Sequence, residues 1–197
     1  MMSDQQPEHI KFSAIPPEFY SDLTREPFDS CVNCGKNLLI PGTLYIIEKA
    51  IVQTQPHQTK NTIFEYAMCF DCWEETKKSL SAESLQNIQE YFAQRVDFKN
   101  RISDLKEEES MDKWLGSCIV KGKDRSELKE YQIACQCDGP YMAYHFLPYL
   151  ISGEVMEELM ELLSEQTLGE MDNFKKKLTA PDPDLEELFD KKKILLV

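Results

Sequence analysis

Two pairs of cysteines constrain this sequence more than any other feature it contains. The first pair, Cys31 and Cys34, lies in CVNCGK, and the second pair, Cys69 and Cys72, lies in CFDCWE. Two thiolates at this spacing can chelate one tetrahedral ion from a tight turn, and two such pairs supply a closed set of four ligands. Because residues 1–12 lack the apolar run of a secretory signal, we expect metal ligation in a reducing compartment and not disulfide bonds.

The residues around these pairs predict a knuckle, a hairpin and a helix, in that order. Gly35 permits the left-handed backbone that closes a knuckle. Residues 38–52 are rich in β-branched side chains and predict a strand, and the polar stretch 53–61 predicts the hairpin loop. After Cys72 the apolar spacing becomes helical. The second pair is therefore expected on the first turn of a helix, whose dipole favours thiolates over thiols.

This order of elements resembles a treble-clef zinc finger over residues 31 to about 80. The resemblance implies one structural zinc ion held by Cys31, Cys34, Cys69 and Cys72. It concerns architecture only, because treble clefs serve many unrelated functions. All four ligand positions are filled by protein, so no position is left for a catalytic water and the metal is expected to stabilise the fold. A redox pair or four core cysteines are the alternatives, and the sequence leaves open whether the native metal is zinc or iron.

A weaker copy of the same pattern recurs in the second half of the chain. The knuckle CVNCGK at 31–36 corresponds to CIVKGK at 118–123, 87 positions later. At a shift of 83, residues 66–91 and 149–174 share six identities in 26 positions. We interpret this as an internal duplication. The competing interpretation is that helical segments of similar periodicity look alike by chance.

The second copy lacks three of the four metal ligands. Its corresponding positions hold Cys118, Lys121, Ser152 and Val155. One thiolate and one lysine cannot close a zinc site, so this unit is expected to be metal-free and held by its apolar core. In both copies a serine, Ser81 or Ser164, separates two helical stretches and is expected to cap the second helix.

Three further cysteines leave a second metal site open. Cys135 and Cys137 alternate on a predicted strand and face the same way, and with Cys118 and His145 they can supply a Cys3His set. Small cysteine side chains are also common in apolar cores, and we favour packing for all three. A redox role for these cysteines is the third alternative.

We therefore expect an α+β fold of two tandem treble-clef-like units, the second without metal, joined by helices. The expected segments are an extended N-terminal segment (1–30), the zinc-binding unit (31–98), a connecting helix (99–117), the degenerate repeat (118–178) and a C-terminal tail (179–197). The apolar end of this tail, ILLV, can add to a sheet or dock a partner.

Charge narrows the classes of partner. The chain has 35 Asp and Glu residues against 22 Lys and Arg residues, a net charge of −13. This charge repels phosphate backbones and argues against nucleic-acid binding, in spite of the zinc-finger resemblance. No stretch approaches the roughly 20 apolar residues of a membrane helix, so we expect a cytoplasmic protein that does not contact a membrane.

The sequence contains no recognisable catalytic constellation. Its three histidines, His9, His57 and His145, lack acidic partners at a recognisable spacing. We therefore expect a zinc-stabilised adaptor or scaffold that binds another protein, whose identity the sequence does not give. The alternative is an enzyme with a site at the interface of the two units.

Overall fold

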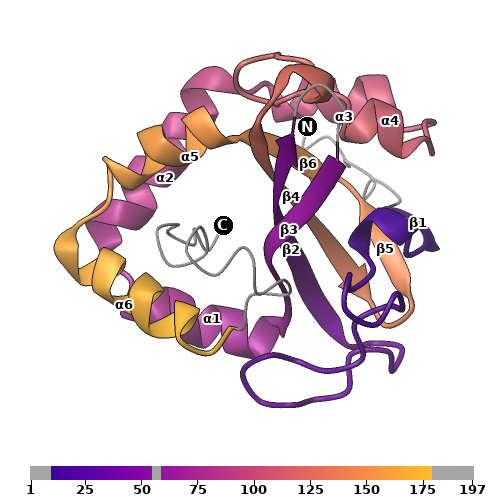
Figure 1. Ribbon diagram of the computed structural model, residues 1–197, viewed down its shortest axis with the longest axis horizontal. Helices are drawn as coiled ribbons and strands as arrows, with labels where there is room; N and C mark the ends of the chain where they lie inside the picture. The colour runs from indigo at the N-terminus through magenta and orange to yellow at the C-terminus, as the bar shows by residue number, and fades with distance from the viewer. Residues whose placement is uncertain (1–9, 55–58, 179–197) are drawn as a thin grey trace, which may run out of the picture.

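The computed structural model describes residues 10–54 and 59–178, so the predicted tail at 179–197 lies outside the described residues. Its centre is a six-stranded antiparallel sheet with the order β1-β5-β4-β2-β3, in which β6 lies beyond β5 along the same edge of β4 (Figure 1). The strands are β1 (Lys11–Ala14), β2 (Leu44–Thr54), β3 (Thr59–Cys69), β4 (Glu130–Asp138), β5 (Tyr141–Tyr144) and β6 (Tyr149–Ser152). The predicted α+β class is therefore confirmed.

Helices cover the sheet from one side. The α-helices are α1 (Phe70–Ser79), α2 (Ala82–Arg95), α3 (Phe98–Leu105), α4 (Met111–Trp114), α5 (Gly153–Met160) and α6 (Glu165–Lys175). Two 3-10 turns, η1 (Pro17–Phe19) and η2 (Arg125–Glu127), lie in the connections. Figure 1 shows α1, α2, α5 and α6 together on one side of the sheet, and α3 and α4 near one of its ends.

The central strand pair joins the two halves of the chain. Strand β2 pairs with β3 on one side and, along the whole of β4, with that strand on the other. In this register Ile47 lies between Ala67 of β3 and Cys135 of β4. Strand β2 is mostly buried, because both of its faces are covered. A strand of this kind does not alternate between apolar and polar residues, and β2 is accordingly largely apolar.

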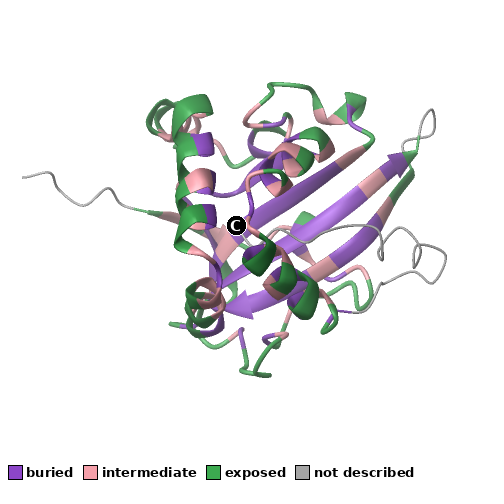
Figure 2. Cartoon of the chain, turned by 90° about the vertical axis from the view of Figure 1, so that its left-hand side faces the viewer, coloured by how far each residue is buried: buried purple, intermediate pink, exposed green. Residues whose placement is uncertain are grey.

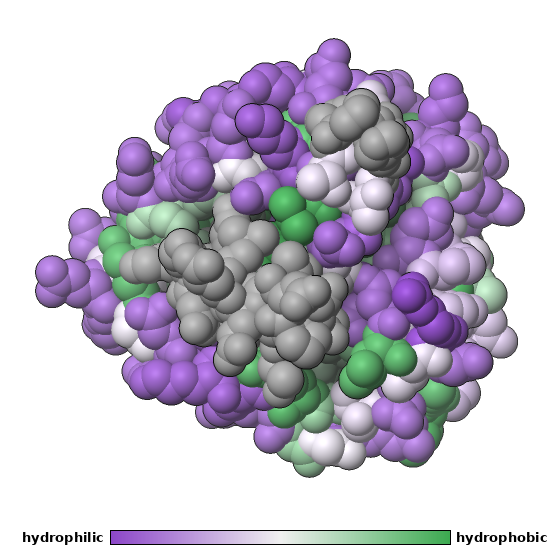
Figure 3. Space-filling model, viewed as in Figure 1, coloured by the Kyte–Doolittle hydropathy of each residue, from purple (hydrophilic) through white to green (hydrophobic). Residues whose placement is uncertain are grey.

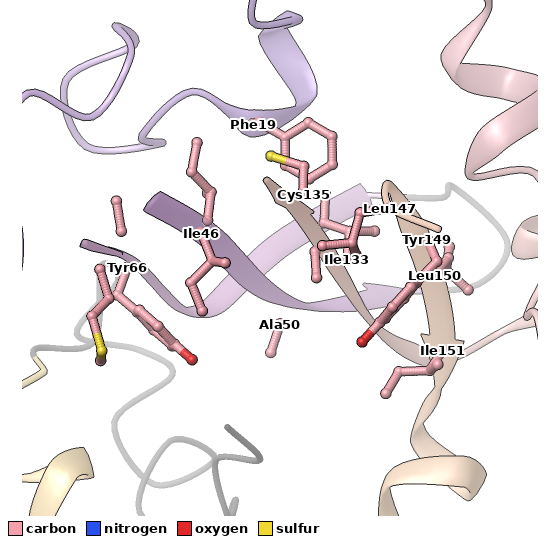
Figure 4. Close-up of a cluster of buried hydrophobic side chains, with 14 of the residues drawn as sticks. Phe19, Ile46, Ala50, Tyr66, Ile133, Cys135, Leu147, Tyr149, Leu150 and Ile151 are labelled. Carbon is pink, nitrogen blue, oxygen red and sulfur yellow. The ribbon is translucent and has the colours of Figure 1, made fainter. Parts of the chain in front are cut away.

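The apolar core occupies both faces of the sheet. Figure 2 shows buried residues along the strands and on the inner sides of the helices. In the close-up, Phe19 and Cys135 lie on one side of the sheet, whereas Tyr66 and Ala50 lie on the other (Figure 4). All four residues belong to one cluster of buried side chains that spans both halves.

The serines that cap α2 and α6 lie at helix starts that contact each other. Ser81 accepts a hydrogen bond from the Ser84 amide, and Ser164 accepts one from the Thr167 amide, so both predicted N-caps are confirmed. The Ser81 amide donates to Thr167 Oγ1 at 3.0 Å, and the Ser164 amide donates to Ser84 Oγ at 2.9 Å. The starts of α2 and α6 are thereby held together by reciprocal hydrogen bonds.

The structure differs from the sequence predictions in its connections. The segment 99–117, predicted as one helix, holds two short helices. Between them the Glu108 carboxylate accepts the amides of Glu109 and Ser110, which draws this backbone away from a helical pattern. The hairpin loop predicted over 53–61 is also shorter, since β2 continues to Thr54 and β3 begins at Thr59.

The N-terminal segment contributes a strand that the sequence did not predict. Within the expected extended segment 1–30, β1 pairs with β5 in a register that sets Lys11 opposite Tyr144 and Ala14 opposite Tyr141. Such pairing between distant parts of a chain leaves no local signature in a four-residue stretch. Strand β1 forms one end of the described sheet, as β3 forms the other.

Candidate metal centre

The four cysteines of the two C-x-x-C pairs lie together. The sulfurs of Cys31, Cys34, Cys69 and Cys72 are all within 4.8 Å of one another. The distance from Cys34 Sγ to Cys69 Sγ is 3.8 Å. Four sulfurs at about 2.3 Å from a tetrahedral ion lie about 3.8 Å apart, so this spacing suits one bound ion. The cluster can therefore hold a metal, and a donor set of four thiolates suits Zn²⁺.

Backbone hydrogen bonds position the first pair. The Cys31 amide donates to the Lys36 carbonyl at 2.9 Å, and the Gly35 amide donates to the Cys31 carbonyl at 2.8 Å. Gly35 has φ +70°, a conformation that a side chain would disfavour. The Val32 amide donates to the Ala67 carbonyl of β3 at 2.9 Å, which fixes the knuckle against the end of the hairpin.

The second pair lies where β3 passes into α1. Cys69 is the last residue of β3 and the N-cap of α1, and Cys72 lies in the first turn of that helix. The Cys69 amide donates to Cys31 Sγ at 3.4 Å, so the backbone of one pair supports a ligand of the other. Of the four ligands, only Cys34 is exposed.

The surroundings of the sulfurs act on their protonation in opposite directions. Burial acts to raise the pKa of Cys31, but amides of Cys69, Cys34 and Asn33 lower that pKa to about 7. Burial and the nearby sulfurs of Cys34 and Cys69 raise the pKa of Cys72 to about 12. A divalent cation at the centre of the cluster removes the repulsion among thiolates, so metal binding is expected to release protons.

The same hydrogen bonds recur at 118–123. The Cys118 amide donates to the Lys123 carbonyl at 2.9 Å, and the Gly122 amide donates to the Cys118 carbonyl at 2.8 Å. Gly122 has φ +67°. The Ile119 amide donates to the Leu150 carbonyl of β6 at 2.9 Å, as Val32 does to Ala67.

The match extends to the start of the following helix. The Ser152 amide donates to Cys118 Sγ at 3.4 Å, as the Cys69 amide does to Cys31 Sγ. Ser152 is the N-cap of α5, and its side chain accepts the Val155 amide. An ion pair between Lys123 and Glu154 at 2.6 Å corresponds in position to the pair between Lys36 and Asp71 at 2.9 Å.

Other contacts occupy the second knuckle where the first has sulfurs. Lys121, at the position of Cys34, forms an ion pair with Glu158 of α5. The Glu158 carboxylate also accepts the Tyr91 hydroxyl of α2. Val155, at the position of Cys72, is fully buried. The knuckle is therefore tied to α5 by an ion pair, and the same Glu158 carboxylate links α5 to α2.

The remaining sequence candidates do not gather into one donor group. Cys135 Sγ lies 3.7 Å from Cys137 Sγ, whereas Cys118 Sγ lies 3.6 Å from Ser152 Oγ. His145 packs edge-on against Phe146, and burial lowers its pKa. Within the described ranges, the four-cysteine cluster is the one group of three or more potential donors close enough to share an ion.

The sequence analysis did not identify a group of buried charged residues on the sheet. Lys49 is 2% exposed, and its ammonium lies 3.1 Å from Asp22, 3.2 Å from Glu65 and 2.6 Å from the Tyr20 carbonyl. Its neighbour Glu48 faces the opposite side of the sheet, where it accepts the Tyr66 hydroxyl at 2.6 Å. The signal was present, since Glu48 and Lys49 interrupt an otherwise apolar strand.

Comparisons with known proteins identify no relative of this chain. No protein-family model matches the sequence, and neither the curated proteins nor the solved structures contain a significant match. No helix in the described part of the chain is long and apolar enough to cross a membrane.

Proposed function

We propose that this protein is a zinc-stabilised adaptor that binds another protein through an apolar surface beside β1. One observation carries the proposal: Phe12, Ile40, Leu44 and Tyr141, here called the β1 patch, are 49%, 55%, 42% and 51% exposed. Figure 3 shows apolar residues at the surface on the lower right, below the place of β1 and β5 in the same view. Exposed apolar side chains gathered at one place are typical of protein interaction sites.

The geometry of the β1 patch suits a partner that brings an extended segment. The sheet register places Leu44 and Tyr141 on either side of Asp138, and Phe12 lies one strand further along. A depression of about 550 Å³, lined by Phe12, Pro41 and Tyr141 among others, adjoins the strand. Because β1 ends the described sheet, its outer backbone groups can pair with an added strand while apolar side chains fill the depression.

In this proposal the metal is structural and is zinc. The four thiolates leave no open coordination position for a substrate. The ion would tie the knuckle, the end of β3 and the start of α1 to one point, and three of its four ligands are buried. Its role is therefore to hold the sheet that presents the β1 patch.

The proposal also treats the chain as two copies of one treble-clef-like unit, the first with metal and the second without. The matched hydrogen bonds of the two knuckles and the reciprocal caps of α2 and α6 support this interpretation. In the second copy the pair of Lys121 and Glu158 takes the place of the ion. The copy that lost its metal thus kept its backbone geometry by other contacts.

A photo-crosslinking experiment tests the adaptor function. We would place p-benzoylphenylalanine at position 141 of the full chain, express it in the native host and irradiate the cells. We expect one discrete covalent adduct with another protein. The matched control carries the same group at position 94, an exposed glutamine on α2.

The position 94 control and a second substitution within the β1 patch decide whether the crosslink reports specific binding. Addition of Phe12→Ser to the position 141 protein should abolish the adduct while zinc content and thermal stability stay unchanged. The adaptor proposal fails if position 141 yields no adduct, or if positions 141 and 94 yield the same adducts.

A further inference from the structure

A second cavity lies on the face of the sheet that the N-terminal segment covers. Its volume is about 570 Å³, within the range of about 300–1,000 Å³ that is usual for small-molecule sites. Ile51, Ile133 and Leu115 supply apolar walls, and Tyr131 lies among them. The cavity shares no lining residue with the cysteine cluster or with the β1 patch.

The cavity is lined by more basic than acidic residues, whereas the whole chain is acidic. Four basic residues, Arg25, Lys49, Lys60 and Arg125, line it together with two acidic ones, Glu18 and Asp22. The whole chain carries a net charge of −13. An excess of cations in a concave site of so acidic a protein is expected to attract an anion.

Not all of these cations are available to a ligand. The Lys49 ammonium is fully occupied by Asp22, Glu65 and the Tyr20 carbonyl. It therefore seals one wall of the cavity and does not bind a ligand. The binding charge must come from the residues nearer to solvent.

Lys60 and Arg125 meet this requirement. Lys60 on β3 is exposed and forms no ion pair with any described residue. Arg125 in η2 uses one terminal nitrogen for Asp112 at 2.9 Å, and its side chain is 23% exposed. A guanidinium has five N–H donors, so Arg125 keeps several for a ligand.

Tyr131 adds a neutral donor to the lining of the same cavity. The residue is 4% exposed and lines the cavity. Burial raises the pKa of this phenol, Arg125 lowers it and Asp22 raises it. The hydroxyl therefore stays protonated at neutral pH and can donate to an anion.

The backbone at the mouth of the cavity is held in an uncommon conformation. Arg25 has φ +63°, which residues with a side chain rarely adopt. The turn is closed by the Arg25 amide, which donates to the Ser21 carbonyl at 2.8 Å, and by the Ser21 amide, which donates to the Glu26 carbonyl at 2.9 Å. The Arg25 guanidinium lies 3.4 Å from the Asp22 carboxylate, so this turn places a charged pair among the lining residues of the cavity.

We propose that this cavity binds a small organic anion, a carboxylate or a phosphate ester on an apolar body, through Lys60, Arg125 and the Tyr131 hydroxyl. The apolar walls receive the body of the ligand, and the cationic side receives its charged group. This site is independent of the adaptor function, since it uses none of the residues of the β1 patch.

Titration of the zinc-loaded full chain by calorimetry tests the proposal with four probes. Phenyl phosphate and benzoate combine an anion with an apolar body, benzyl alcohol has the body alone, and inorganic phosphate has the charge alone. We expect phenyl phosphate or benzoate to bind at least about tenfold more tightly than either single-feature probe. Preference between the two anions identifies the ligand as a phosphate ester or a carboxylate.

Substitutions of the two cationic residues test whether the probes bind in this cavity. Lys60→Gln and Arg125→Gln should each weaken the preferred probe about tenfold. Lys78→Gln, which removes an exposed lysine on α1, should leave affinity unchanged. If Arg125→Gln fails to fold, Lys60→Gln decides alone, because Lys60 is exposed. The proposal is overturned if neither anion binds, if benzyl alcohol binds as tightly, or if Lys60→Gln binds like the parent chain.

Discussion

Lys49 is a charge in a place where an uncharged residue would be expected. It lies in the central strand β2, and its side chain is 3% exposed. Three acceptors surround the ammonium, one for each of its donors: Asp22, Glu65 and the Tyr20 carbonyl. The Glu65 carboxylate in turn accepts the Ser21 hydroxyl at 2.7 Å. The ammonium thus fastens the N-terminal segment to the middle of the sheet.

Removing this charge should be costly. Lys49→Met keeps the length of the side chain but leaves the carboxylate of Glu65, which is 7% exposed, without its cation. We expect a loss of about 3–5 kcal/mol in the free energy of unfolding, as for other buried pairs broken at one partner. Urea denaturation of the zinc-loaded protein measures it. Lys78→Met, which removes an exposed pair with Glu75, is the matched control and should have little effect. Equal effects of the two substitutions would show that the burial of Lys49 is unimportant.

The knuckle is the element that most clearly recurs, and its two versions differ in what closes them. Cys31 and Cys118 have the same backbone hydrogen bonds, and each sulfur accepts an amide at the start of the next helix at 3.4 Å. The first knuckle contributes two cysteines to a cluster that can hold a metal ion, whereas in the second knuckle Lys121 forms an ion pair with Glu158. Backbone geometry and ligand identity are therefore separable in this element.

If the two knuckles are copies, the second should regain a metal when its ligands are restored. The triple substitution Lys121→Cys, Ser152→Cys and Val155→Cys, added to Cys118, supplies four thiolates on a matching backbone. We expect elemental analysis to find two zinc ions per chain, against one in the parent protein. The control carries serine at positions 121 and 155 and should bind one. A folded triple-cysteine variant that still binds a single zinc would contradict the duplication.

The predictability of these elements from sequence depended on how local each one is. The four cysteines, Gly35 and the serine caps act on neighbours within a few residues, so spacing alone located them. The pairing of β2 with β4 joins residues that are 78 to 94 positions apart, as in Ile47 opposite Cys135. No local pattern records that register. The polar loop at 53–61 was overestimated because Gln53, which is polar, is buried and donates to the Leu128 carbonyl at 3.0 Å.

At the scale of the whole molecule, the two halves are parts of one sheet. From the sequence alone, loss of the metal would be expected to unfold the N-terminal half and leave the second half to its own core. The structure instead pairs β2 of the first half with β4 of the second along all of β4. One apolar cluster also includes Tyr66 and Phe174, whose rings lie 5.0 Å apart. The halves therefore share both hydrogen bonds and core.

Removal of the metal should consequently unfold both halves together. Structural zinc contributes about 10–16 kcal/mol to folding in small domains, which exceeds or equals the stability of most proteins. Two tryptophans allow each region to be followed separately. Trp73 lies on α1 beside the cysteine cluster, and Trp114 is 1% exposed and packs against Tyr144 of β5. The variants Trp73→Phe and Trp114→Phe each leave one reporter.

We expect the fluorescence of both single-tryptophan variants to change at the same chelator concentration when a strong zinc chelator and a thiol reductant are added. Coincident transitions are the sign of one cooperative unit, and addition of excess zinc should reverse both. The buried Trp114 should shift to longer wavelength as its contact with Tyr144 is lost. A transition seen by Trp73 while Trp114 keeps its native emission would mean that the second half folds on its own core, and that the pairing of β2 with β4 does not couple them.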